Sequence, residues 1–259
     1  MGGVLAQLPA LPRRATLAIT ASPAKGLDAS VAMAERLRGE GFEVVVHVAA
    51  RMVADRSQLR RLLVRLRRAD VDRAFVIGGD APTPGAYPDA LSLLHAMAEM
   101  GHHFREIGIG CYPQGHPRIS DDRLLDALRA KAPFAHYMTT QLCFDAEALS
   151  GWVAARRRDG LELPVDIGVP GAIETAKLLL FSARVGVADA SRFVVKYGNL
   201  VARLLRPGGY RPNGLLAQLA PMLADPRAGV RGMHMYTFNQ LERTEGWRRQ
   251  YLAGLSGTR

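Results

Sequence analysis

The chain has 259 residues, 48% of them hydrophobic, which is enough to bury a sizeable core in one large α/β domain or two small ones. Lys and Arg number 34 against 24 Asp and Glu, and the formal net charge of +10 favours acidic partners such as nucleic acids, membrane surfaces or polyanionic small molecules. No apolar run reaches membrane-spanning length, and the opening "MGGVLAQLPALPRR" lacks the features of a signal peptide. A cytoplasmic protein without a membrane segment is therefore expected.

Short β-branched runs alternate with amphipathic helical patterns from residue 15 onward, which is typical of a parallel α/β fold. Strands are predicted at 15–20, 43–49, 73–79, 106–113, 135–143, 163–171 and 229–238. Helical patterns cover 27–41, 56–70, 87–101 and 121–132, and two or three further helices are expected within 174–225. No linker or composition shift divides the chain. We therefore predict a single domain over 1–259, with 1–14 as a poorly ordered lead-in.

The helix predicted at 56–70 carries much of the excess positive charge. Leu59, Leu62, Leu63 and Leu66 recur at helical spacing, so the arginines between them fall on the outer face. A solvated surface is the expected reading, and nucleic-acid binding through these arginines is the weaker alternative, because no nucleic-acid module or aromatic interleaving accompanies them. The remaining special residues, Cys111 and Cys143, lack metal-ligand spacing and indicate a reduced compartment, no disulfide and no metal site.

Polar and glycine residues gather directly after the predicted strands, where a β/α barrel places its active site. They are Gly78, Gly79 and Asp80, then Tyr112 and His116, Gln141, Gly171, and finally Tyr236 and Asn239. A doubly wound sheet would concentrate such residues around one switch point, whereas here nearly every strand contributes. The stretch "IGIGCYPQGHP" (107–117) does not have dinucleotide-loop spacing, so we read it as a barrel strand and the loop that follows it.

Four segments, in order, resemble the methylenetetrahydrofolate reductase family. "FVIGGDAP" is similar to the family's "LALRGDPP", "IGIGCYPQGHP" to "IGVAGYPEGHP", "MTTQLCFD" to "IITQLFFD", and "GVRGMHMYTFN" to "GVHFYTLN". The resemblance implies a (β/α)8 TIM-like barrel and a role in one-carbon metabolism and methionine biosynthesis. The implied reaction interconverts 5,10-methylenetetrahydrofolate and 5-methyltetrahydrofolate by hydride transfer, using FAD and NAD(P)H.

The same likeness assigns roles to individual residues. Asp80 and Gln141 would be catalytic, with Asp80 beside the flavin and pterin and Gln141 reading the pterin amide edge. His47, Asp80, Tyr112, His116 and Lys131 would contact the cofactor, while Gln141, Tyr236 and Asn239 would bind the folate. Structural alternatives remain open for three of them: a turn or N-cap aspartate at Asp80, a rim residue satisfying backbone at Gln141, and a core histidine at His47.

Three departures from the family pattern stand out. The family's general-acid glutamate falls at Thr20, whose hydroxyl has no useful pKa; Asp166 is a substitute candidate, although an exposed strand-end aspartate is the more common role. Gly78 stands where the family has a phosphate-binding arginine. One family strand near the N-terminus has no counterpart, so a βα unit is absent or modified. A flavin-free enzyme, a non-catalytic folate- or flavin-binding paralogue, and a partner-dependent subunit are the alternatives, and a homo-oligomer is compatible with each.

Overall fold

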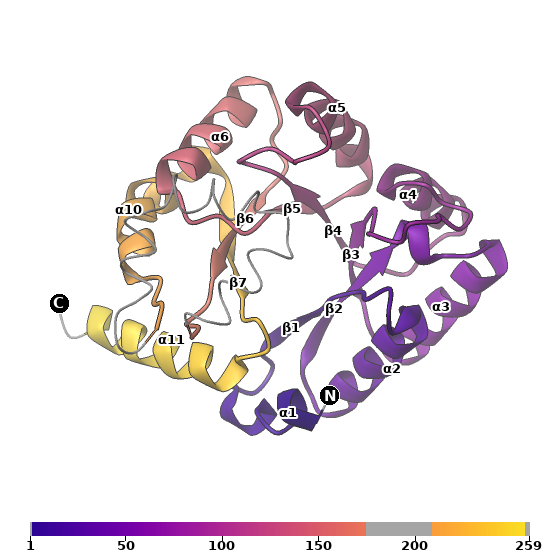
Figure 1. The fold of residues 1–259 in the computed structure, drawn as a ribbon, viewed down its shortest axis with the longest axis horizontal. Helices are drawn as coiled ribbons and strands as arrows, with labels where there is room; N and C mark the ends of the chain where they lie inside the picture. The colour runs from indigo at the N-terminus through magenta and orange to yellow at the C-terminus, as the bar shows by residue number, and fades with distance from the viewer. Residues whose placement is uncertain (1, 175–208, 257–259) are drawn as a thin grey trace.

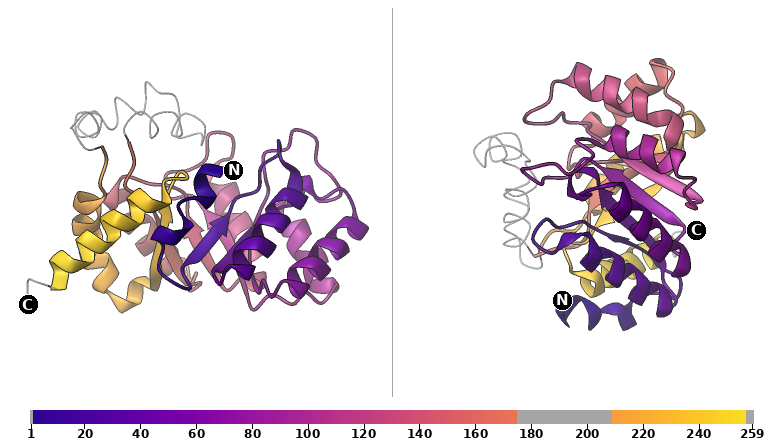
Figure 2. Two further views of the ribbon diagram at one scale, coloured as in Figure 1. Left: turned by 90° about the horizontal axis from the view of Figure 1, so that it is seen from below. Right: turned by 90° about the vertical axis from the view of Figure 1, so that its right-hand side faces the viewer.

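The computed structural model describes residues 2–174 and 209–256, and its centre is a parallel sheet (Figure 1). The seven predicted strands are all confirmed, each within the predicted range, and they pair in chain order. They are β1 Thr16–Ile19, β2 Glu43–Ala49, β3 Arg73–Ile77, β4 Glu106–Cys111, β5 Tyr137–Thr140, β6 Val165–Pro170 and β7 Val230–Tyr236. Because every neighbouring pair is parallel, the carboxyl ends of the strands lie at one edge of the sheet (Figure 2).

Helices surround the convex side of this sheet (Figure 1). Their bounds are α1 Gly2–Leu5, α2 Gly26–Gly39, α3 Arg56–Arg68, α4 Ala90–Glu99, α5 Asp121–Lys131, α6 Ala146–Arg158, α10 Asn213–Ala224 and α11 Leu241–Ser256, with short 3-10 turns η1 Leu8–Ala10, η2 Ala50–Met52, η3 Ala132–Phe134 and η4 Pro226–Ala228. None of these described helices is long and apolar enough to cross a membrane. Of the helices expected within 174–225, α10 is observed, and residues 175–208 lie outside the described part of the chain.

Three of the helices, α3, α4 and α6, begin at an aspartate that caps their first turn. In α3 the four leucines are buried against the sheet, and Asp55 caps the helix by accepting a hydrogen bond from the Gln58 amide at 2.7 Å. Asp89 and Ser92 make a capping box on α4, and Asp145 caps α6. The predicted position of the arginines of α3 on the outer face is thereby confirmed.

The sheet is curled but open over the described residues, so the eight strands of the expected barrel are not confirmed. The described residues contain seven strands, with no pairing between β1 and β7. Helix α2 connects β1 directly to β2, and these two strands are neighbours in the sheet. No further strand lies between them, in agreement with the predicted absence or modification of one βα unit near the N-terminus. An eighth strand is absent from residues 2–174 and 209–256, and the architecture observed there is a half-barrel of α/β type.

The segment before β1 includes residues 2–14 of the stretch that we expected to be a poorly ordered lead-in, and it packs against α11 at the other open edge of the sheet. Leu8 is buried, and η1 packs against α11. The Gln7 side chain donates to the Asn239 carbonyl at 3.1 Å and accepts from the Glu242 amide at 3.2 Å, while Arg249 donates to the Ala10 carbonyl at 2.6 Å. These hydrogen bonds satisfy polar groups near both ends of the described residues.

Charged side chains fill the concave face near the amino ends of the strands. Asp166 and Arg231 form a two-point ion pair, with Nη2 2.7 Å from Oδ2 and Nε 3.1 Å from Oδ1. Arg231 also lies 3.4 Å from Glu106 and stacks 3.7 Å above the Tyr137 ring. Asp166 is therefore neither the exposed strand-end residue that we considered nor a substitute acid, because it lies at the start of β6 and already has a cationic partner.

Candidate active site

The middle of the concave face is filled by aromatic rings. His47 of β2 lies 4.8 Å from Phe75 of β3, whose ring lies 6.3 Å from Tyr137 of β5. Gly108 of β4 allows this packing, because a Cβ atom there would come within 2.4 Å of the Tyr137 ring and 2.6 Å of Phe75. The rings thus form a floor across four strands, above the charged groups around Arg231.

The interior opens directly above this floor. Gly110 lies two residues after Gly108 on the same face of β4, and a Cβ atom built on it would meet no atom of residues 2–174 and 209–256 within 4 Å. Gly78, at the end of β3, is equally unobstructed. As far as the described residues go, a planar ligand therefore has room against the backbone of β4 near its carboxyl end, with the aromatic floor below it.

Asp80, Tyr112 and His116 surround the mouth of this opening. Asp80 is exposed in the loop after β3, and its carboxylate interacts electrostatically with both of the other residues, which follow β4. Tyr112 and His116 meet edge to face at 5.4 Å. Burial raises the pKa of Tyr112, and the Asp80 charge adds to that shift. The structure therefore brings together three of the predicted site residues.

His116 is held in a defined orientation. Its Nδ1 accepts a hydrogen bond from the Arg118 amide at 3.2 Å, so a proton on the neutral ring resides on Nε2. Burial and Arg118 lower the pKa of His116, whereas Asp80 raises it. The ring is therefore a group that can donate a hydrogen bond at the mouth of the site.

Gln141 and Tyr236 form the opposite wall. Gln141 Oε1 accepts from the Leu142 amide at 2.8 Å, and the Tyr236 hydroxyl donates to the Thr140 carbonyl at 3.2 Å. Burial raises the pKa of Tyr236 well above its usual range, and Tyr112 is one of the groups that act on it electrostatically. Gly168 of β6 makes room for the Tyr236 ring, because a Cβ atom there would lie 2.8 Å from Cε2.

Three of the predicted site residues, His47, Lys131 and Asn239, form no hydrogen bond, ion pair or ring contact with Asp80, Tyr112, His116, Gln141 or Tyr236 among the described residues. His47 belongs to the aromatic floor, below the opening. Lys131 ends α5 on the helical side of the sheet, where burial lowers its pKa and its electrostatic partners are Cys111 and Asp89. Asn239 is exposed with a φ of 62°, and its carbonyl accepts from Gln7 beside the N-terminal segment.

Sequence reasoning missed two residues. His234 of β7 reaches the same interior: it contacts the Tyr236 ring edge to face at 4.8 Å and interacts electrostatically with His47 across the concave face. Arg51 follows β2 and hydrogen-bonds the loop that carries Asp80. His234 could have been predicted from the sequence, because it lies two residues before Tyr236 and therefore on the same face of the strand. No local sequence pattern marks Arg51.

His47 gives the structure a testable pH dependence. Burial, assisted by His234, lowers the pKa of His47 from 6.5 to about 3. Between these values the unfolded chain binds a proton that the folded chain does not, so this residue lowers stability as the pH falls, by at most about 1.4 kcal/mol per pH unit. Urea midpoints at pH 7 and pH 5 should differ less for His47→Phe than for the wild type. The exposed His95→Gln variant should keep the wild-type difference, and an unchanged difference in His47→Phe would contradict the assignment.

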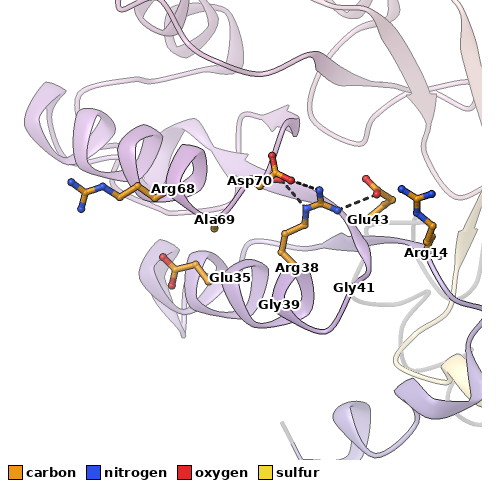
Figure 3. A pocket seen from close by; sticks show the side chains of 9 residues that line it. All are labelled: Arg14, Glu35, Arg38, Gly39, Gly41, Glu43, Arg68, Ala69 and Asp70. Carbon is orange, nitrogen blue, oxygen red and sulfur yellow. Dashed lines mark hydrogen bonds and ion pairs between the residues drawn. The ribbon is translucent and has the colours of Figure 1, made fainter.

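A separate pocket of about 530 Å³ lies at the other edge of the sheet, where the strands begin (Figure 3). At its centre Arg38 donates to the carboxylates of Asp70 and Glu43 and to the Asp70 and Phe42 carbonyls. These bonds tie the turns before β2 and β3 together, so Arg38 serves the fold. The chemistry of the strand ends, and not the volume of this pocket, identifies the candidate active site.

Comparison with known proteins places most of the chain beside a known family. The sequence pattern of the family described as Methylenetetrahydrofolate reductase matches residues 18–246, a range that includes Asp80, Tyr112, His116, Gln141 and Tyr236. Among solved structures, one of a protein assigned as a phosphonomutase from Burkholderia cenocepacia is similar over 76% of each chain, with 16% identity and a TM-score of 0.40. A similarity of that size carries no argument about the function of this chain.

Proposed function

Because the chain belongs to the methylenetetrahydrofolate reductase family, we propose that it is an oxidoreductase interconverting 5,10-methylenetetrahydrofolate and 5-methyltetrahydrofolate, with FAD and NAD(P)H as hydride carriers. The observation that carries this proposal is that Tyr112 and His116 meet edge to face, that both experience the charge of Asp80, and that no described residue fills the space at the neighbouring Gly110. The folate's acidic tail and the cofactor's phosphates also suit a chain of net charge +10.

Asp80 would act on charge that develops in the substrate. Opening the five-membered ring of the methylene-folate leaves a cationic iminium, which a nearby carboxylate stabilises more strongly than it stabilises the neutral ground state. Asp80 can take this role because none of the described residues forms an ion pair with it, whereas Asp166 is neutralised by Arg231. Gln141 would orient the pterin: its Oε1 is engaged by Leu142, so its amide nitrogen is available to donate to the pterin carbonyl.

The opening fits a planar ring system such as an isoalloxazine or a nicotinamide. Gly110 provides a surface without side-chain atoms, and Tyr112 and His116 stand at its rim. A bound flavin would supply a reversible two-electron hydride carrier. Gly78 offers no guanidinium for a diphosphate, so the phosphate end would rely on other groups. Direct hydride exchange between nicotinamide and folate is therefore a specific variant of the proposal.

A second candidate function is ligand binding without turnover, or activity that requires a partner subunit. Thr20 favours it, because this residue is exposed at the end of β1 in place of the family's acid. Tight binding of folate or flavin with no turnover at any pH would support this reading.

An anaerobic experiment distinguishes these cases. The purified chain is incubated with FAD, 5-methyltetrahydrofolate is added, and the visible flavin absorption is followed. Bleaching would support flavin-linked hydride transfer from the folate. Conversion of the folate that depends on NAD(P)⁺ without bleaching would support the flavin-free variant. If neither occurs while the folate binds, the oxidoreductase proposal fails and the binding role takes its place.

A further inference from the structure

We propose that Arg51 is a positioning residue that sets the location of Asp80, an inference that rests on the proposed function above. Arg51 lies in η2, directly after β2, whereas Asp80 lies in the neighbouring loop between β3 and α4. The two residues are connected through the backbone of that loop, residues 78–88. Arg51 thus acts on the site without contacting the substrate.

The guanidinium of Arg51 reaches three carbonyl groups of the loop. Nε donates to the Ala81 carbonyl at 2.7 Å, Nη2 to the Pro82 carbonyl at 2.8 Å, and Nη1 to the Pro88 carbonyl at 3.4 Å. The first of these carbonyls belongs to the residue that directly follows Asp80. A displacement of the guanidinium would therefore be transmitted to the Asp80 backbone over a single peptide unit.

Loop 78–88 also forms hydrogen bonds with the backbone of Arg51 in η2. The Arg51 amide donates to the Gly78 carbonyl at 2.9 Å, and its carbonyl accepts from the Gly85 amide at 3.0 Å. The approach is close enough to require glycine, because a Cβ atom on Gly85 would lie 2.1 Å from the Val53 carbonyl oxygen. Gly79, with a φ of +86°, turns directly against Ala49. Both ends of the loop are thereby fixed to the segment after β2.

An arginine is the side chain that this loop needs. The sequence "GGDAPTPGAYP" has prolines at 82, 84 and 88, which lack amide donors, so the loop has few ways of satisfying its own carbonyl groups. The guanidinium offers five N–H donors in a rigid planar fork, and three of them are directed at carbonyls here. A lysine would keep the charge but provides a single ammonium on a flexible stem.

A double-mutant cycle tests the coupling. Arg51→Ala and Arg51→Lys should each lower kcat/KM for folate turnover about 10- to 100-fold, since a displacement of about 1 Å can cost a hundredfold. If Arg51 acts through Asp80, adding Arg51→Ala to Asp80→Asn should lower the rate less than about threefold further. The control Arg56→Ala, which removes an exposed ion pair with Glu99 in the next helix, should keep wild-type activity. Independent, multiplicative effects of Arg51 and Asp80 would overturn the proposal.

Hydrogen exchange provides a readout that does not depend on turnover. In Arg51→Ala the amides of Gly85 and Ala86 should exchange faster, while those of β5 and β6 keep wild-type protection. Unchanged exchange at 85–86 would refute the positioning role, and faster exchange throughout would indicate general unfolding instead. If the wild-type chain shows no turnover, the proposed function is overturned. The hydrogen-exchange result still decides whether Arg51 holds the loop.

Discussion

Replacing Asp80 by asparagine is expected to lower kcat/KM for folate turnover by about 100-fold or more, because removal of one preorganised electrostatic group from a reacting site typically costs about that much. The substitution keeps the size of the side chain and one acceptor oxygen, and it removes the charge. Asp80 is exposed, so the fold should be unaffected. The measurement is steady-state turnover of methylene- or methyl-folate, together with the thermal midpoint.

Asp126→Asn is the matched control, because Asp126 is an exposed aspartate on α5 with no described ion pair. Its kinetics should equal those of the wild type. If Asp80→Asn loses less than about tenfold while folate turnover is robust in the wild type, the carboxylate does not stabilise the transition state. Asp80 would then be a turn residue, which was the alternative considered from the sequence.

Replacing Gly168 by alanine is expected to destabilise the fold by about 3 kcal/mol or more, which is at or above the usual cost of overpacking a core. A Cβ atom there would lie 2.2 Å from the Thr140 carbonyl oxygen and 2.8 Å from the Tyr236 ring. The carbonyl belongs to the backbone of β5, and Thr140 is already fixed, because its Oγ1 accepts from the Gly168 amide at 2.7 Å. The Thr140 carbonyl cannot move away without displacing the backbone of β5, so β5 and β6 would be pushed apart.

Gly110→Ala is the control for this variant. It places the same methyl group on the same face of the sheet, where no atom of the described residues lies within 4 Å, so the urea midpoint should stay near that of the wild type. Because the methyl group would enter the opening, this variant should instead weaken binding of the planar ligand. Equal stability of the two variants would show that the packing around Gly168 adapts, and unchanged ligand affinity in Gly110→Ala would place the ligand elsewhere.

Local sequence patterns were sufficient to predict the strands and most of the helices that the structure describes. Every strand contains β-branched residues, and α3 has four leucines at helical spacing behind the Asp55 cap. Strand ends also predicted the neighbourhood of Asp80, Tyr112 and His116, because parallel strands bring their carboxyl ends to one edge. The closed eight-stranded barrel was not confirmed, since pairing between β1 and β7 depends on contacts far apart in the chain.

The sequence by itself determined the alternating β/α order and the family, because each depends on residue types at fixed local spacing. Only the tertiary structure decided which side chains contact one another. It paired Asp166 with Arg231, kept Lys131 on the helical side of the sheet, placed His47 in the floor opposite His234, and directed Arg51 to the Asp80 loop. The physical reason is that the curl of the sheet sets which strands face one another, and the energies of burial and ion pairing depend on those distant neighbours.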